Sequence, residues 1–123
     1  KGHLTGSHSI DHPLFSELNE EEQIRQVRES VNFIQNFTNQ DIHLFAFPYT
    51  DHLVRNSFFE KLHNKQITDF TFGTAGIKKD TAKNNIQRIP VELHGLSAKR
   101  TIKTEYLLYI IKKIFGKHII KRN

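Results

Sequence analysis

Two histidines near the start of the chain are close enough in sequence to bind one metal ion together. His8 and His12 lie four positions apart in the segment Gly-Ser-His-Ser-Ile-Asp-His-Pro, residues 6–13. Neutral imidazole is a good ligand for Zn²⁺ and related divalent ions. Gly6 disfavours a helix and Pro13 favours an extended conformation for the residue before it, so we predict a strand end followed by a turn. In that geometry both imidazoles can still reach one ion.

A pair of histidines is half of a catalytic metal site. Such a site takes about three protein ligands and keeps one position open for water. The chain has no cysteine, so the third ligand would have to be a carboxylate. Asp11 is near in sequence, but in an extended backbone it would point away from its neighbour His12. The alternative is that Ser9, Asp11 and Pro13 form a polar turn before a helix, because eight histidines produce such a spacing by chance.

Apolar spacing and capping residues predict three helices that could position this pair. The first begins after Asn19, where three glutamates suit a helix N-terminus, and its pattern breaks at residues 38–40. The second is expected to be capped by Asp51. The third extends from an N-cap at Ser97 to a C′ glycine at Gly116, and we expect its apolar stripe to be buried.

Apolar runs between these helices predict strands at residues 42–47, 67–72 and 86–91, with a fourth at residues 4–9. Residues 73–85 form a loop rich in Gly, Lys and Asn. The first of these runs is apolar nearly throughout, which is typical of a strand buried on both faces in a parallel sheet. Helices alternating with strands predict an α/β fold of βα units with mainly parallel strands.

The net charge of +5 is concentrated at the C-terminal end. Residues 97–123 carry eight Lys and Arg and one Glu, whereas residues 1–96 carry ten Lys and Arg and twelve Asp and Glu. Lysines near the end of a helix suit its dipole, so the last predicted helix explains part of the charge, and residues 117–123 are expected to be a solvated basic tail. The length allows one domain, and no apolar run approaches the roughly 20 residues of a membrane span.

Two segments of the chain resemble motifs of one enzyme family. Residues 6–13, with the Asn-Glu-Glu-Glu helix start that follows, resemble the second motif of the NodB-type polysaccharide deacetylases (carbohydrate esterase family 4): His, Ser or Thr, two variable residues, His, often Pro. The segment Phe-Ala-Phe-Pro-Tyr-Thr, residues 45–50, resembles the third motif, usually Arg, any residue, Pro, Tyr or Phe, Gly. Residues 70–76 and 88–90 resemble later strands of deacetylase-like proteins of bacterial envelope-polysaccharide gene clusters.

This resemblance implies a partial (β/α) barrel of the deacetylase type. It implies that His8 and His12 bind a divalent metal, zinc in the first place, which polarises the acyl carbonyl and lowers the pKa of the attacking water. Pro48 and Tyr49 would contact the saccharide, with the backbone N–H of Tyr49 holding the oxyanion. His94 is the nearest candidate for the family's histidine acid, and an ordinary loop histidine is the alternative.

The chain departs from the family pattern at three points. Ala46 stands where the third motif usually has Arg, and Thr50 stands where it has Gly. The first motif, Thr-Phe-Asp-Asp, supplies the catalytic base and the third metal ligand, and none of the residues before His8 is Asp or Glu. We therefore expect residues 1–116 to be the C-terminal portion of a deacetylase-like domain, followed by the tail at 117–123, and the chain alone to be inactive.

The function expected from this resemblance is that of a metal-dependent hydrolase removing N-acetyl or related acyl groups from a bacterial cell-envelope saccharide. The alternative is a catalytically inactive, saccharide-binding relative. A third hypothesis is binding of nucleic acid or acidic lipid by the basic tail. It is disfavoured, and no nucleic-acid partner is expected, because the charge lies on a helix whose apolar face is expected to be buried, and the aromatic residues interleaved with it are limited to Tyr106 and Tyr109. Oligomeric state and localisation, cytoplasmic or at the envelope, stay open.

Overall fold

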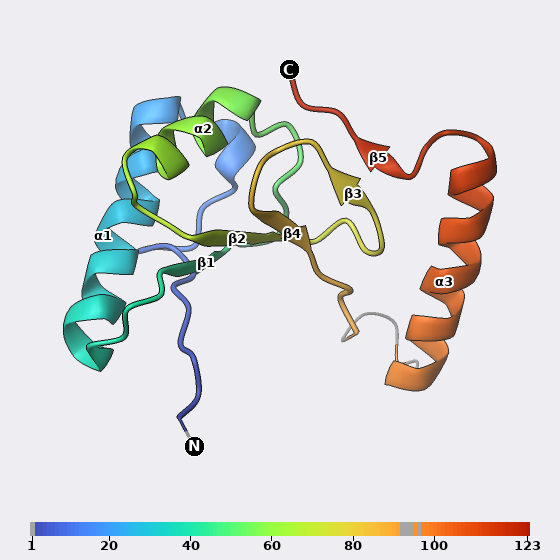
Figure 1. Ribbon diagram of the computed structural model, residues 1–123, viewed down its shortest axis with the longest axis horizontal. Coiled ribbons are helices and arrows are strands. Elements are labelled where there is room, and N and C mark those ends of the chain that lie inside the picture. Colours follow the sequence, from blue (N-terminus) through green and yellow to red (C-terminus); the bar gives the residue numbers. More distant parts are fainter. Residues whose placement is uncertain (1, 92–94, 96) are drawn as a thin grey trace.

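The computed structural model describes residues 2–91, 95 and 97–123 (Figure 1). A short 3₁₀ turn precedes the first helix. The elements in chain order are the 3₁₀ turn Phe15–Glu17, α1 Glu20–Thr38, β1 Leu44–Ala46, α2 Asn56–Asn64, β2 Phe70–Gly73, β3 Lys79–Asp80, β4 Asn85–Gln87, α3 Ala98–Ile114 and β5 Ile119–Ile120.

The central sheet is parallel, as predicted. Its strand order is β1-β2-β4, and both pairings are parallel. The expected strand at residues 4–9 is reduced to one parallel bridge, Ser7 with Phe45, which adds the chain start beside β1. A second parallel pair, β3 with β5, lies outside this sheet, and β3 falls in the stretch expected to be a loop. Helices alternating with parallel strands confirm the α/β class.

Helix α1 begins and ends where the sequence predicts. The side chain of Asn19 accepts a hydrogen bond from the backbone N–H of Glu22, and three glutamates fill the first turn. Asn39 ends the helix in the left-handed conformation. In the first turn, Arg25 donates to both carboxylate oxygens of Glu22, which lowers the pKa of Glu22 to about 2. Local signals therefore fix the helix that follows the two histidines.

Helices α1 and α2 pack on one face of the sheet, where the core lies (Figure 1). Aromatic rings dominate this core, and the ring of Phe47 contacts the rings of Phe15, Phe45, Phe58 and Phe59 at centroid distances of 5.1–6.0 Å. Aliphatic side chains from α1 and α2 complete it: Ile24, Val27, Val31 and Leu62. The loop that follows β1 therefore starts at Phe47, in the centre of the core.

The other face of the sheet is open. Along β1 only Phe45 is buried, and its neighbours are half-buried, so the strand is not covered on both faces as its apolar sequence had suggested. Phe70 and Ile86, which project from β2 and β4, are exposed. The expectation of a strand covered on both faces is wrong for the described residues, in which α1 and α2 pack on one face of the sheet and the other face stays partly exposed.

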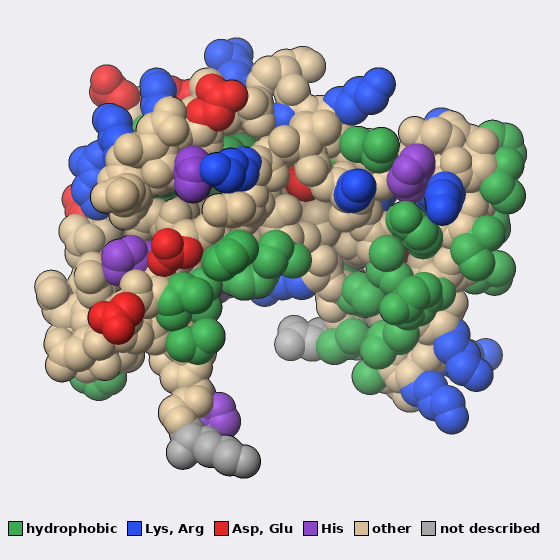
Figure 2. All heavy atoms as spheres, viewed as in Figure 1, with side chains coloured by type: hydrophobic (Ala, Val, Ile, Leu, Met, Phe, Trp, Pro, Cys, Tyr) green, Lys and Arg blue, Asp and Glu red, His purple; other side chains and the backbone are tan. Residues whose placement is uncertain are grey.

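Helix α3 occupies almost the predicted residues but not the predicted environment. Ser97 is its N-cap, and Gly116 follows it with a φ of 67°. None of its residues is buried, and Figure 2 shows hydrophobic side chains exposed over it. Figure 1 shows it apart from α1 and α2, on the far side of the sheet. The apolar stripe predicted the helix correctly, but the expectation that the stripe is buried is wrong.

The segment after α3 is not a solvated tail. Ile119 and Ile120 form β5, which pairs with β3. The side chain of Arg122 is 3 % exposed and forms ion pairs with Asp51 and Asp80. The charge that the sequence suggested was solvated is therefore in part an internal ion pair, because two carboxylates from distant segments lie beside it.

Candidate functional site

The candidate site lies at the carboxyl ends of the parallel strands. Ser7 bridges to β1, and His8 follows it directly. Pro48 and Tyr49 follow the end of β1 in the same direction, so the parallel arrangement brings both motif segments to one edge of the sheet. This edge is where ligands bind in open α/β sheets, because loops from several strands converge there.

The imidazole of His8 is oriented by the backbone of β1. Its Nδ1 atom lies 2.8 Å from the carbonyl oxygen of Ala46. A carbonyl oxygen can only accept, so Nδ1 carries the proton and Nε2 presents a lone pair. A hydrogen bond of this kind fixes the ring and the tautomer of histidines that bind metals.

The second histidine is carried by a turn, as predicted, and not by a helix, but its own backbone is left-handed and not extended as Pro13 had suggested. His12 has a φ of 58° and Ser9 a φ of 69°. The side chain of Ser9 accepts a hydrogen bond from the backbone N–H of His12 at 3.0 Å. Left-handed backbone at two residues so close together is costly for side chains other than Gly and Asn, and such strain gathers at functional sites. The turn directs His12 toward His8.

The two histidines meet through their Nε2 atoms, which lie 3.1 Å apart. With Zn–N distances of about 2.0–2.1 Å, two ligands at angles from about 90° to tetrahedral lie about 2.9–3.4 Å apart. Both rings are exposed, so an ion could reach them. The pair therefore fits two positions of a divalent metal site. Among the residues that the structure describes, no group of three His, Cys, Asp or Glu side chains could hold an ion, and Asp11 does not complete the pair.

Tyr49 borders the pair from the loop after β1. Its ring packs edge-on against the ring of His12, with centroids 4.6 Å apart, and it is 65 % exposed. Its φ is 52°, a third left-handed residue at the site. The neighbouring Pro48 is fully buried and anchors the loop. Within the described part of the chain, no acceptor is bound to the backbone N–H of Tyr49, so this N–H is available to a ligand.

Side chains that directly follow β2 and β4 hold the loop of Tyr49 in place. The hydroxyl of Thr74 donates to the carbonyl oxygen of Tyr49 at 3.0 Å. Nη2 of Arg88 donates to the carbonyl oxygen of Phe47 at 2.7 Å, immediately before the loop. The strand ends thus support the loop through its carbonyls and leave the N–H of Tyr49 free.

Asp51 is not the helix cap that the sequence suggested. Helix α2 begins at Asn56, with Arg55 as its N-cap residue. The carboxylate of Asp51 is buried and accepts hydrogen bonds from Asn85 Nδ2 at 2.9 Å and Gln87 Nε2 at 2.7 Å. Helix propensity was therefore the wrong explanation for this residue, because partners on β4 and at the chain end determine its position.

Gly73, at the end of β2, lets the Asp51 carboxylate approach. A Cβ at this position would lie 2.3 Å from Asp51 Oδ2 and 2.5 Å from Gln87 Nε2. Gly73→Ala is expected to destabilise the fold by about 1–3 kcal/mol, the usual cost of overpacking, measured as a lower midpoint of urea unfolding. Gly2→Ala is the matched control, because nothing lies within 4 Å of a Cβ there. Equal stability of the two variants would show that the fold does not depend on the close approach of the Asp51 carboxylate to Gly73.

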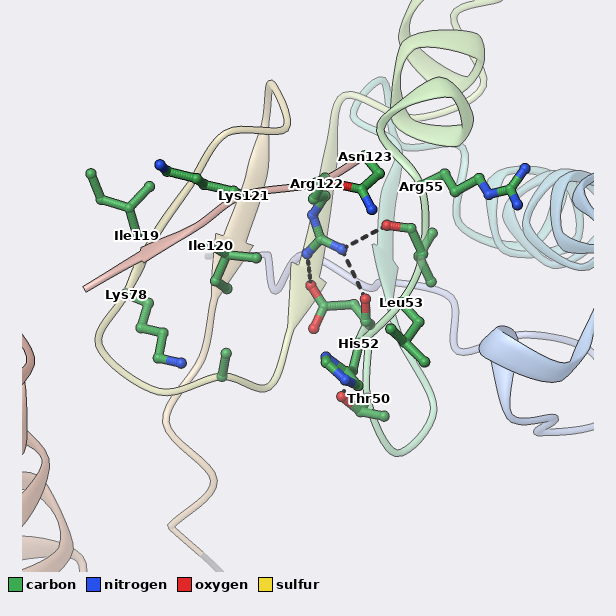
Figure 3. A pocket seen from close by; sticks show the side chains of 13 residues that line it. Thr50, His52, Leu53, Arg55, Lys78, Ile119, Ile120, Lys121, Arg122 and Asn123 are labelled. Carbon is green, nitrogen blue, oxygen red and sulfur yellow. Dashed lines mark hydrogen bonds and ion pairs between the residues drawn. The ribbon is translucent and has the colours of Figure 1, made fainter. Parts of the chain in front are cut away.

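A cavity of about 690 Å³ lies along the same loop (Figure 3). Thr50, His52 and Leu53 line it from one side, and Lys78 and Arg122 line it from segments after β2 and β5. Its lining does not include His8, His12 or Tyr49. The loop after β1 therefore carries two surfaces, one toward the histidine pair and one toward this cavity.

Several supporting residues of the site could not be recognised from sequence spacing. Thr74, Arg88, Asp80 and Arg122 act through contacts between segments far apart in the chain. The only sequence signal for them is the presence of polar residues at strand ends. His94, the candidate acid, lies outside the described residues.

These observations define a class of α/β protein. Its parallel strands present two paired histidines and a Pro-Tyr loop at their carboxyl ends. The model of the family "Polysaccharide deacetylase" matches residues 1–68, which include both histidines and the loop of Tyr49. The chain belongs to the polysaccharide deacetylase family, as the two motifs suggested. No curated protein and no solved structure was found to match it.

Membership places the chain in a family of deacetylase-like hydrolases with saccharide substrates. No helix in residues 2–91, 95 and 97–123 has both the length and the apolar character needed to cross a bilayer.

Proposed function

We propose that this chain forms part of a metal-dependent hydrolase that removes N-acetyl or related acyl groups from a bacterial cell-envelope saccharide. The observation that carries the proposal is the 3.1 Å separation of the Nε2 atoms of His8 and His12. The family match supports the deacetylase class. Metal dependence and the envelope substrate are inferences from the donor set and from the resemblance of the motifs.

His8 and His12 would hold the metal, most simply Zn²⁺, with a third, carboxylate ligand. When bound, the ion polarises the acyl carbonyl and lowers the pKa of water. The protein contributes orientation: Ala46 fixes His8, and the turn at Ser9 fixes His12. Two ligands held in this way lose little freedom when the ion binds.

Pro48 and Tyr49 would contact the saccharide. The exposed Tyr49 ring offers a flat apolar surface to a sugar. Its T-shaped contact with the His12 ring keeps this surface next to the histidine pair. The free backbone N–H of Tyr49 would donate to the oxygen on which negative charge develops during acyl transfer. Thr74 would keep that N–H oriented, because it holds the carbonyl oxygen of the same residue.

The open sheet face supports a partial (β/α) barrel as the architecture. In such a barrel, parallel strands carry helices on the outer side and face other strands across the interior. Here α1 and α2 cover one face of β1, β2 and β4, and the other face is open and partly apolar. We propose that residues 1–116 form a portion of a deacetylase-like domain.

The test is release of acetate from N-acetylglucosamine oligomers by the native protein supplied with Zn²⁺. His8→Ala is expected to lower the rate by more than about 100-fold, since even partners behind a metal ligand contribute about 10–100-fold. His63→Ala is the matched control, because His63 lies on α2 and contacts Lys83 instead of the pair. A native protein that binds saccharide but neither binds Zn²⁺ nor releases acetate would overturn the proposal and indicate a non-catalytic relative.

A further inference from the structure

The guanidinium of Arg122 is the most completely bonded charged group in the described part of the chain. Its Nε donates to Asp80 Oδ1 at 2.9 Å, and Nη2 donates to Asp80 Oδ2 at 2.6 Å and to Asp51 Oδ2. Its Nη1 donates to the carbonyl oxygens of Asp51 at 2.8 Å and Val54 at 3.0 Å. These five bonds use all five N–H groups of the side chain.

Arg122 is buried together with two carboxylates, so one positive charge faces two negative charges. The side chains of Asp51 and Asp80 are 3 % and 1 % exposed, and the guanidinium lies 4.5 Å from the ring centroid of Phe59. Burial would raise the pKa of Asp80, but hydrogen bonds from Arg122 and the amide of Ala82 hold that pKa below its ordinary value. Both carboxylates depend on Arg122 for their counter-charge, because Asn85 and Gln87 supply only neutral donors.

Three of the five bonds end on the loop that also carries Tyr49. Figure 3 shows Arg122 above this loop, with dashed lines to its oxygen atoms. The Asp51 carboxylate in turn accepts from the backbone N–H of Thr74 at 3.4 Å, and the Thr74 hydroxyl donates to the Tyr49 carbonyl at 3.0 Å. A continuous set of contacts therefore joins the chain end to the residue beside His12.

We propose that Arg122 is a positioning residue that holds the Tyr49 loop against the histidine pair, acting through Asp51 and Thr74. The inference rests on the proposed function for the meaning of the loop, but the contacts themselves do not depend on a metal. Lysine could not substitute, because an ammonium group has three donors and cannot reach two carboxylates and two carbonyls in one plane. The last residues of the chain are thus part of the site's support.

The first test is Arg122→Lys, with the positions of Tyr49 and His12 followed by NMR in the absence of metal. We expect loss of the cross-peaks between the Tyr49 and His12 rings, now 4.6 Å apart, and faster amide exchange at Val54 and Thr74 by at least about 10-fold. The amides of α1 and β2 should stay protected. Lys121→Gln, the adjacent exposed cation, should change none of these signals.

Thr74→Val is a second variant that keeps the test decisive if Arg122→Lys unfolds the chain. It removes the hydroxyl bonded to Tyr49 but leaves the buried ion pairs intact, so only the Tyr49 and His12 signals should move. Unchanged ring cross-peaks in Thr74→Val, or uniform acceleration of all amides in Arg122→Lys, would overturn the positioning role.

The same variants separate this inference from the proposed function. In the native protein, Arg122→Lys should lower kcat for acetate release by about 10–100-fold, as expected for a displacement of about 1 Å, while Zn²⁺ affinity stays unchanged. If native protein binds no Zn²⁺ but the loop still moves in Arg122→Lys, the proposed function fails and the positioning role stands. A variant that loses Zn²⁺ affinity and kcat together would contradict the positioning role.

Discussion

Replacing His8 or His12 with alanine is expected to lower the affinity of the native protein for Zn²⁺ by more than about 100-fold, measured by calorimetric titration. Each imidazole supplies one of the two nitrogen atoms that lie 3.1 Å apart, and neither can be replaced by a neighbour in the described residues. Ala46 orients only the His8 ring, so loss of His12 leaves a correctly oriented but single ligand. The two single variants and the double variant should therefore lose affinity to a similar extent.

The matched control for this titration is His52→Ala. His52 is exposed on the Tyr49 loop, but it does not contact the histidine pair. Because His8 and His12 are also exposed, none of the three substitutions should lower the unfolding temperature by a large amount. Zn²⁺ affinity that is equal in wild type, His8→Ala and His12→Ala would mean that the pair is not a metal site.

Phe47→Ala is expected to lower the free energy of unfolding by about 3–5 kcal/mol, measured by urea denaturation. Phe47 is fully buried, and its ring contacts four other phenylalanines. Native domains have about 5–15 kcal/mol of stability in total, so the variant would lose a large share of it. The loss would also move Pro48 and Tyr49, because they follow Phe47 directly.

Phe37→Ala tests whether this effect comes from burial. Phe37 is 80 % exposed on α1, so its removal should change stability by less than about 0.5 kcal/mol. If both substitutions lowered the urea midpoint equally, the aromatic cluster would not be the centre of the core. A large effect of Phe37→Ala alone would show that the exposed end of α1 is covered in solution.

Local sequence signals predicted the parts of the fold that depend on neighbours in the chain. The cap at Asn19, the left-handed end at Asn39 and the boundaries of α3 all come from contacts within one turn of helix. The parallel direction of the strands followed from the alternation of helices and strands. The turn at residues 9–12 was predicted from Gly6 and Pro13, but its left-handed backbone at Ser9 and His12 was not. The histidine pair could also be located from the sequence, because His8 and His12 are only four positions apart.

Sequence patterns could not predict what depends on distant segments. Asp51 looked like a cap because its hydrogen-bonding type suits one, but its partners are Gln87, Asn85 and Arg122. Arg122 looked solvated because it follows a basic stretch. An apolar stripe predicts that α3 is a helix, but it does not say whether anything covers that stripe, and in the described residues nothing buries it.

The ion pair of Arg122 with Asp51 joins residues 71 positions apart, more than half the length of the chain. Contacts of such long range form slowly, since the loop between the partners must close first. During synthesis the residues of the histidine turn and β1 leave the ribosome well before Arg122 does. The residues of the histidine turn and β1 are therefore available for folding earlier, whereas the loop that carries Tyr49 gains its final support only once Arg122 has emerged. Maturation of the site would then wait for the synthesis of Arg122.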